Sequence, residues 1–144
     1  MSKILRHLTS QEVDYHCRRT IDHYQQVASA FQAGTADHDV TQNIESLLKH
    51  IRGTPPFRVL DFGCGPGRDL ESFTKLGHKP VGLDGCEAFL SMAHQLTGCP
   101  VLHQRFESLE LPPATFDGIF ANASLFHVPS QILSRVLRQL NGCL

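Results

Sequence analysis

The sequence predicts an α/β fold in which helices cover both faces of a parallel sheet. From residue 57 onward, short apolar runs alternate with segments whose apolar residues recur at helical spacing, and this alternation is typical of βαβ units. A loop with three glycines directly follows the first apolar run, as expected where a buried strand turns sharply into a helix. The length of 144 residues fits one domain, since single domains contain about 50 to 250 residues.

Residues 1–53 are predicted to form an N-terminal helical cap. Two segments, 18–34 and 40–53, carry apolar residues at helical spacing, and each therefore has one apolar stripe. The stripe residues are Ile21, Tyr24, Ala28 and Phe31 in the first segment and Ile44, Leu47, Leu48 and Ile51 in the second. We expect Thr41 to cap the second helix and Gly53 to end it.

Residues 57–144 carry the predicted strands and helices of the core. Four short runs rich in β-branched and apolar residues predict strands, and they span 57–62, 79–84, 100–106 and 117–123. Three segments with helical spacing predict helices, and they span 69–77, 87–98 and 130–142. The side chains that we expect these helices to bury are Leu70, Phe73 and Leu76, then Phe89, Met92, Ala93 and Leu96, and finally Ile132, Leu133, Val136, Leu137 and Leu140.

Composition and charge argue against several classes of function. The net charge of −1 comes from interspersed charges, so the chain has no basic stripe for nucleic acid. No apolar run approaches the roughly 18 residues that cross a membrane, and polar residues interrupt the N-terminus, unlike a signal peptide. The five cysteines form no CxxC pair and the nine histidines no HxxxH spacing. We therefore expect reduced thiols, no metal site and a cytoplasmic protein.

The stretch VLDFGCGPGRDL, residues 59–70, places glycines at alternate positions after the first predicted strand; they are Gly63, Gly65 and Gly67. Such glycines let the backbone approach a ligand closely. Their GxGxG spacing differs from the dinucleotide pattern GxGxxG, and no Walker-type Lys-Ser/Thr pair follows. Asp84 ends the second predicted strand, where a carboxylate can accept hydrogen bonds from both ribose hydroxyls. Together the two features predict a nucleoside pocket.

The ordered motifs VLDFGCGPG, VGLDG and FDGIFANASLFHV resemble those of class I S-adenosylmethionine-dependent methyltransferases, in particular small bacterial members that act on small molecules. The resemblance covers roughly residues 20–140. It implies a Rossmann-like sheet with the strand order 3-2-1-4, S-adenosylmethionine as cofactor, and methyl transfer to a small-molecule substrate.

The same resemblance implies a site for each part of the cofactor. The methionine end would be held by the first strand end and the glycine-rich loop, through Asp61, Gly63, Cys64, Gly65, Pro66 and Gly67. Asp84 would bind the ribose, and Gly85, Cys86, Arg105 and Phe106 would border the adenosine. In the family an acidic residue often stands where this chain has Arg105, which accepts no hydrogen bond.

The resemblance also implies a place for the methyl acceptor. Asn122, Ala123 and Ser124 would lie beside the transferred methyl group, and Tyr24 would cover the cofactor. Because histidine titrates near neutral pH, His127 is the first candidate for a catalytic base and His38 the second.

Each feature also has a purely structural interpretation. The glycines would serve in a tight turn, Asp84 as a helix N-cap, Tyr24 as a core residue and His127 as a loop histidine. For the whole chain, the alternatives are a catalytically silent cofactor-binding domain, a nicotinamide-dependent oxidoreductase, and a protein-interaction module with a vestigial fold. Measurements of cofactor binding and of methyl transfer would distinguish these alternatives.

In similar proteins three further strands follow the last predicted helix, whereas the printed sequence ends with NGCL. We therefore expect a C-terminally truncated sheet that lacks strands 5–7 and leaves its fourth strand as an uncovered edge. Because an apolar edge strand is a template for pairing with another chain, the sequence predicts dimerisation through this edge, domain swapping or poor solubility.

Overall fold

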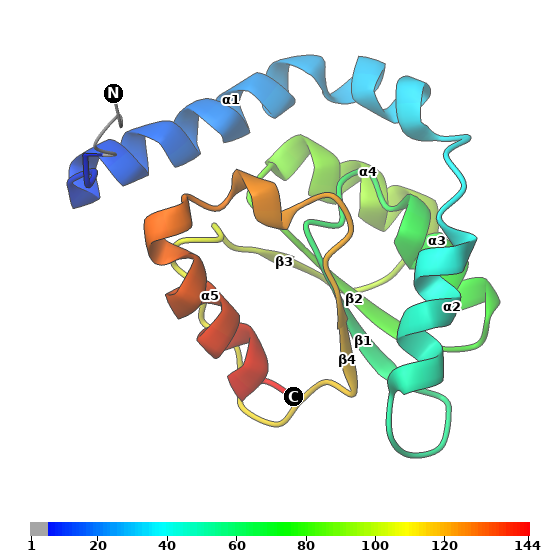
Figure 1. Cartoon of the computed structure of the whole chain (residues 1–144). Helices are drawn as coiled ribbons and strands as arrows, with labels where there is room; N and C mark the ends of the chain where they lie inside the picture. Colours follow the sequence, from blue (N-terminus) through cyan, green and yellow to red (C-terminus); the bar gives the residue numbers. More distant parts are fainter. Residues whose placement is uncertain (1–5) are drawn as a thin grey trace.

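The computed structural model describes residues 6–144 and contains a four-stranded parallel sheet. The strands are β1 (Arg58–Phe62), β2 (Lys79–Asp84), β3 (Val101–His103) and β4 (Gly118–Phe120). Their order is β3-β2-β1-β4, which confirms the predicted order (Figure 1). Because the strands are parallel, their carboxyl ends meet at one edge of the sheet, where ligands bind in open α/β folds.

The central strand β1 is buried on both faces of the sheet. Every residue after Arg58 is buried, and successive side chains point to opposite faces. Val59 packs with Phe73 on one face, whereas Leu60 and Phe62 belong to the core cluster on the other. The prediction of a strand buried on both sides is therefore confirmed.

Helices lie on both faces of the sheet, as the sequence predicts. On one face are α2 (Thr41–His50), α3 (Arg68–Lys75) and α4 (Glu87–Thr97), whose apolar side chains pack against the strands in two clusters. The other face is covered by α5 (Ser130–Gly142), and Figure 1 shows α5 across the sheet from α2 and α3.

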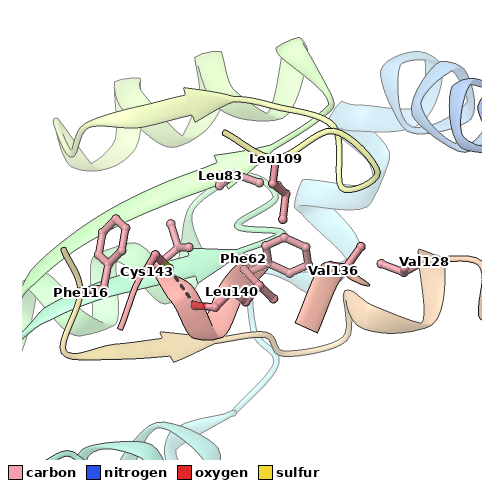
Figure 2. Packing of buried hydrophobic residues seen from close by; sticks show 9 residues of the cluster. Phe62, Leu83, Leu109, Phe116, Val128, Val136, Leu140 and Cys143 are labelled. Atoms are coloured by element: carbon pink, nitrogen blue, oxygen red, sulfur yellow. Dashed lines mark hydrogen bonds between the residues drawn. The ribbon is translucent and has the colours of Figure 1, made fainter. Parts of the chain in front are cut away.

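The largest core cluster lies between the sheet and α5 (Figure 2). Phe62 and Leu83 come from the two central strands, and Val136 and Leu140 come from α5. Full burial of each such side chain stabilises the fold by about 1.5–3 kcal/mol. Cys143 lies in the same cluster, and its thiol donates a hydrogen bond to the Leu140 carbonyl over 3.0 Å.

The longest helix is α1 (Ser10–Thr35), with 26 residues. It begins at Ser10 rather than at residue 18, because Thr9 and Glu12 form a capping box in which each side chain binds the other's backbone N–H. Residues 1–5 of the predicted N-terminal cap lie outside the described part of the chain. Within residues 6–144, no helix combines the length and apolar character that crossing a membrane requires.

Several local predictions are wrong. Thr41 is the first residue of α2 and not its cap; its backbone N–H donates to Asp39 instead, and the helix ends at His50, before Gly53. The strands β3 and β4 are shorter than expected. Three leucines expected in the core are exposed, namely Leu76, Leu96 and Leu137. Leu76 lies past the end of α3 and Leu96 in the last turn of α4, whereas Leu137 follows buried Val136 and so points about 100° away from it.

Candidate functional site

A cavity of about 230 Å³ lies at the carboxyl ends of β1, β2 and β4. Its walls come from the glycine-rich loop (residues 63–67), the loop after β2, the segment after β3, and the segment after β4 that includes the 3-10 helix η1 (Leu125–His127). α1 contributes another wall and crosses over this end of the sheet (Figure 1). The segment after α1 and the first residues of α3 and α4 complete the lining.

The glycine-rich loop needs glycine for both conformation and space. Gly63 and Gly65 have φ angles of 79° and 52°, a region that side chains rarely adopt. A Cβ at Gly63 would overlap the Cβ of Ser124, whose hydroxyl donates to the Phe62 carbonyl over 2.6 Å. The bare backbone of Gly65 faces the cavity. The loop thus does more than form a tight turn, because it also brings backbone to the cavity wall.

Asp61 is the second-last residue of β1, just before this loop, and is 1% exposed. Its Oδ2 atom is buried without a hydrogen-bond partner. Burial, followed by the nearby carboxylates of Asp69 and Asp84, raises the pKa of Asp61 well above its usual value. Asp61 does not itself line the cavity, and neither does Gly67. A buried acid of this kind suits a cationic ligand group beside the loop.

Asp84 lines the cavity at the end of β2. Its Oδ2 accepts a hydrogen bond from the Gly65 N–H over 3.0 Å, and its Oδ1 accepts one from the Cys86 N–H over 2.9 Å. Burial raises its pKa. The N-cap of α4 is Cys86, without a side-chain cap bond, so the N-cap interpretation of Asp84 is wrong. Its carboxylate instead joins the two loops that form the cavity.

Aromatic side chains of α1 form the opposite wall. Tyr24 and Phe31 pack edge to face at 5.3 Å between ring centroids, and Phe89 of α4 lies 5.5 Å from Tyr24 and 5.1 Å from Phe31. All three line the cavity. Tyr24 is therefore both a packing residue and a cavity residue, and the two interpretations of it do not compete.

Tyr24 also joins α1 to η1. Its hydroxyl forms a 2.9 Å hydrogen bond with Nε2 of His127, which lines the cavity. Burial lowers the pKa of His127 and raises that of Tyr24, so both groups are neutral at pH 7. The neighbouring Phe126 is 71% exposed and does not line the cavity.

Arg105 does not line the cavity. Its Nη2 atom donates to Asp14 of α1 over 2.8 Å and lies 2.5 Å from Oε1 of Glu107. The expectation that Arg105 flanks an adenine is wrong, because these two acids draw its guanidinium away from the cavity. Glu107 does line the cavity, beside Phe106, which stacks on Phe62 at 4.2 Å.

The remaining candidate residues lie on the cavity wall; they are Cys64, Pro66, Gly85, Cys86, Asn122, Ala123 and His38. Ala123 has a φ of 55°, a strained conformation that is typical of functional loops. Sequence reasoning missed Ile21 as a wall residue and also Arg68, whose Nη1 donates to the Thr35 carbonyl of α1 over 3.0 Å. In the described part of the chain, no group of three His, Cys, Asp or Glu side chains is arranged to hold a metal.

Acidic side chains at and near the cavity could hold hydrogen-bond donors of a ligand. Asp84 and Glu107 both line it, and Phe106 lines it beside Glu107. Asp61, which precedes the glycine-rich loop, does not line the cavity, but one of its buried oxygens has no hydrogen-bond partner. Because carboxylates accept hydrogen bonds, these acids could pair with ammonium, hydroxyl or amino groups.

Two curated relatives are enzymes that transfer methyl groups. The chain is 26% identical over 147 residues to malonyl-[acyl-carrier protein] O-methyltransferase of Legionella pneumophila. The aligned region covers 94% of this chain and 49% of the relative. It is 36% identical over 98 residues to ubiquinone biosynthesis O-methyltransferase of Hahella chejuensis, and this second aligned region covers 64% of this chain and 41% of the relative. The chain thus spans about half the length of the curated relatives it matches.

A solved structure shares the fold over almost the whole chain. It is 1,6-didemethyltoxoflavin-N1-methyltransferase of Burkholderia thailandensis, bound to 1,6-didemethyltoxoflavin and S-adenosylhomocysteine. The TM-score is 0.76 at 21% identity, over 98% of this chain and 62% of the other.

The glycine-rich loop and everything after it fall within one family match. Residues 59–144 match the family described as "Methyltransferase domain". This span holds β2, β3, β4 and all of β1 except Arg58, with the loops that follow them. The family uses S-adenosylmethionine. The chain therefore belongs to the class I S-adenosylmethionine-dependent methyltransferases.

Proposed function

We propose that this chain binds S-adenosylmethionine in the cavity and transfers its methyl group to a small-molecule acceptor. The observation that carries the proposal is the convergence of the glycine-rich loop, Asp84 and Glu107 on one cavity. Five free, buried cysteines suit a reducing compartment, so we also propose that the protein is cytoplasmic.

We assign the parts of the cofactor to residues as follows. The glycine-rich loop and Asp61 would hold the methionine end, with the carboxyl group of Asp61 facing the ammonium. Asp84 would accept hydrogen bonds from the ribose hydroxyls. Glu107, in place of Arg105, would accept a hydrogen bond from the adenine amino group, and Phe106 would pack against the base. Bound in this way, S-adenosylmethionine would supply an activated methyl group.

The chain's own contribution to the reaction would be to position the acceptor, exclude water and take up a proton. α1 covers the cavity, which excludes water. Because its lowered pKa keeps His127 neutral at pH 7, its imidazole is free to accept a proton. In the tautomer that carries the proton on Nδ1, Tyr24 donates to Nε2. An acceptor beside Tyr24 would then give its proton to the hydroxyl oxygen as the hydroxyl proton passes to His127.

A small acceptor agrees better with the site than a nucleic acid does. α1 covers one side of the cavity, and the net charge of −1 gives no general attraction for polyanions. The relatives named above act on different acceptors according to their names. His38, which also lines the cavity, remains the second candidate for a base.

A second candidate function is a cofactor-binding domain without activity. The cofactor site and the wall that faces the acceptor are separate parts of such folds, and the latter varies most. A nicotinamide-dependent oxidoreductase has no comparable support, because the glycine spacing differs from the dinucleotide pattern.

Transfer of an isotope-labelled methyl group to a panel of small hydroxyl and amine acceptors tests the proposal. We expect label on an acceptor with the wild type and none with Asp84→Ala. His127→Ala should still bind the cofactor but transfer about 10²-fold more slowly. Binding without transfer to any acceptor would favour the silent domain over the enzyme.

A further inference from the structure

Three charged side chains link the cavity wall to α1. Glu107 faces the cavity, Arg105 lies behind it, and Asp14 lies on α1. The guanidinium touches both acids through the same Nη2 atom, at 2.8 Å from Asp14 and 2.5 Å from Glu107. The side chains of Glu107 and Arg105 are only 12% and 29% exposed, so solvent screens this contact less than it would a surface ion pair.

One buried polar atom of Glu107 and one of Arg105 have no hydrogen-bond partner. Oε1 of Glu107 is buried and lies close to the guanidinium without hydrogen-bond geometry, and Nε of Arg105 is buried without a partner. Buried polar atoms of this kind are uncommon in folded proteins. A small rotation of the Glu107 carboxylate would let one oxygen face a ligand while the other pairs properly with Arg105.

Glu107 also lies against α1 at a second point. Burial, and then the charge of Glu107, raise the pKa of the Cys17 thiol to about 11. Cys17 is one turn along α1 from Asp14 and lines the cavity. The position of the Glu107 carboxylate and the position of α1 are therefore physically connected.

We propose that Arg105 is a positioning residue, which orients Glu107 toward the base of the cofactor and couples base recognition to the seating of α1 through Asp14. This inference rests on the proposed function. Coupling between two such events is reciprocal. Binding of the base thus stabilises the seated helix, and a seated helix strengthens recognition of the base.

The test compares two ligands that differ only at the base. S-adenosylhomocysteine carries a 6-amino group, and S-inosylhomocysteine carries a carbonyl oxygen that Glu107 cannot pair with. We expect the wild type to prefer the amino ligand by about tenfold or more. In Arg105→Ala this preference should fall close to one. Arg18→Ala is the matched control, because Arg18 pairs with Asp14 on the surface and does not touch Glu107.

Hydrogen exchange measures the second half of the coupling. S-adenosylhomocysteine should slow amide exchange along residues 10–35 of the wild type. Asp14→Asn keeps the contact between Arg105 and Glu107 but weakens the link to α1. Because the coupling is reciprocal, this variant should lose most of the protection and also lose part of the ligand preference, though less than Arg105→Ala does. It therefore also serves as the second variant if Arg105→Ala does not fold.

The outcomes separate this inference from the proposed function. If Arg105→Ala leaves the preference undiminished, for example by weakening the binding of both ligands by the same factor, Arg105 only holds the structure together and the inference is overturned. Unchanged protection of α1 in Asp14→Asn would overturn it as well. If the folded wild type binds neither ligand, the proposed function itself fails and takes the inference with it.

Discussion

At the scale of single residues, the carboxyl group of Asp61 is buried in a way that lowers the stability of the folded state. One oxygen has no hydrogen-bond partner, and burial raises its pKa well above the usual value. The folded state therefore retains a proton that the unfolded state releases once the pH exceeds its ordinary pKa. Stability must fall as pH rises through that window, between the usual pKa of an aspartate and the raised pKa of the folded state.

The variant Asp61→Asn tests this account of the buried acid. An amide cannot ionise, so the variant should not lose stability as pH rises through the window. Near neutral pH we expect it to equal or exceed the wild type, by up to about 1–3 kcal/mol, and to bind S-adenosylhomocysteine less well. Urea unfolding at pH 5 and pH 7.5 measures the stabilities. An Asn variant that is less stable than the wild type at both pH values would contradict the argument.

The hydrogen bond between Tyr24 and His127 allows a second prediction at this scale. Tyr24→Phe keeps the ring contacts with Phe31 and Phe89 but removes the hydroxyl. Since one hydrogen bond contributes about 1 kcal/mol, S-adenosylhomocysteine should dissociate about fivefold faster. Stopped-flow displacement measures the rate. Tyr15→Phe is the control, because Tyr15 lies on the same helix and is exposed, and an equal effect there would refute the specific role.

The positions of some cavity residues could be predicted from the sequence because the strand pattern alone decides them. Gly63 and Gly65 follow β1 and Asp84 ends β2, so all three lie at the same edge of the sheet. Glu107 was missed because it lies in the segment after β3, where no strand pattern sets its position. Arg105, two residues before it, contacts Asp14 of α1. That contact joins residues far apart in the sequence, which local patterns do not encode.

At the scale of elements, α1 is the part of the chain that turns an open sheet edge into a covered cavity. Tyr24, Gln25 and Asp14 each hold it to the core, and Gln25 accepts a hydrogen bond from the Ala88 N–H over 3.1 Å. We propose that the N-terminal cap, predicted as residues 1–53, acts as a unit over the core of residues 57–144. The cap would then control access to the cofactor.

The capping box at the start of α1 provides an element-level prediction. The Thr9 hydroxyl accepts a hydrogen bond from the Glu12 N–H, and Glu12 accepts one from the Thr9 N–H. Thr9→Ala should destabilise the first turn by about 1 kcal/mol, and Thr9→Ser should not. Hydrogen exchange over residues 10–17 measures the effect. If the Ala and Ser variants exchange alike, the box does not set the start of the helix.

The bounds of a strand or helix were predicted correctly where the sequence carries clear start and stop residues, and incorrectly where the pattern is weak at one end. The strand at 79–84 and the helix at 130–142 match their predicted ranges, since glycine or proline punctuates both. The start of α1 was missed although Thr9 and Glu12 carry the capping signal, because the apolar stripe is clear only from Ile21 onward.

At the scale of the whole molecule, the alternation of predicted strands and helices and the family resemblance predicted the order of the strands in the sheet. Neither predicts what packs beside the free edge of β4. Among the described residues, β4 pairs with β1 on one side only. An unpaired strand edge favours association, so the dimer stays a prediction. Light scattering over a hundredfold range of concentration should show the mass rising toward twice the chain mass of 16.0 kDa. A constant monomer mass would contradict it.

The most direct test of the central claim is calorimetric titration of the chain with S-adenosylmethionine and S-adenosylhomocysteine, with NAD as the control ligand. The account predicts saturable, micromolar binding of both adenosyl ligands, no binding of NAD, and loss of binding in folded Asp84→Ala. A folded wild type that binds neither ligand, or that binds NAD equally well, would contradict it.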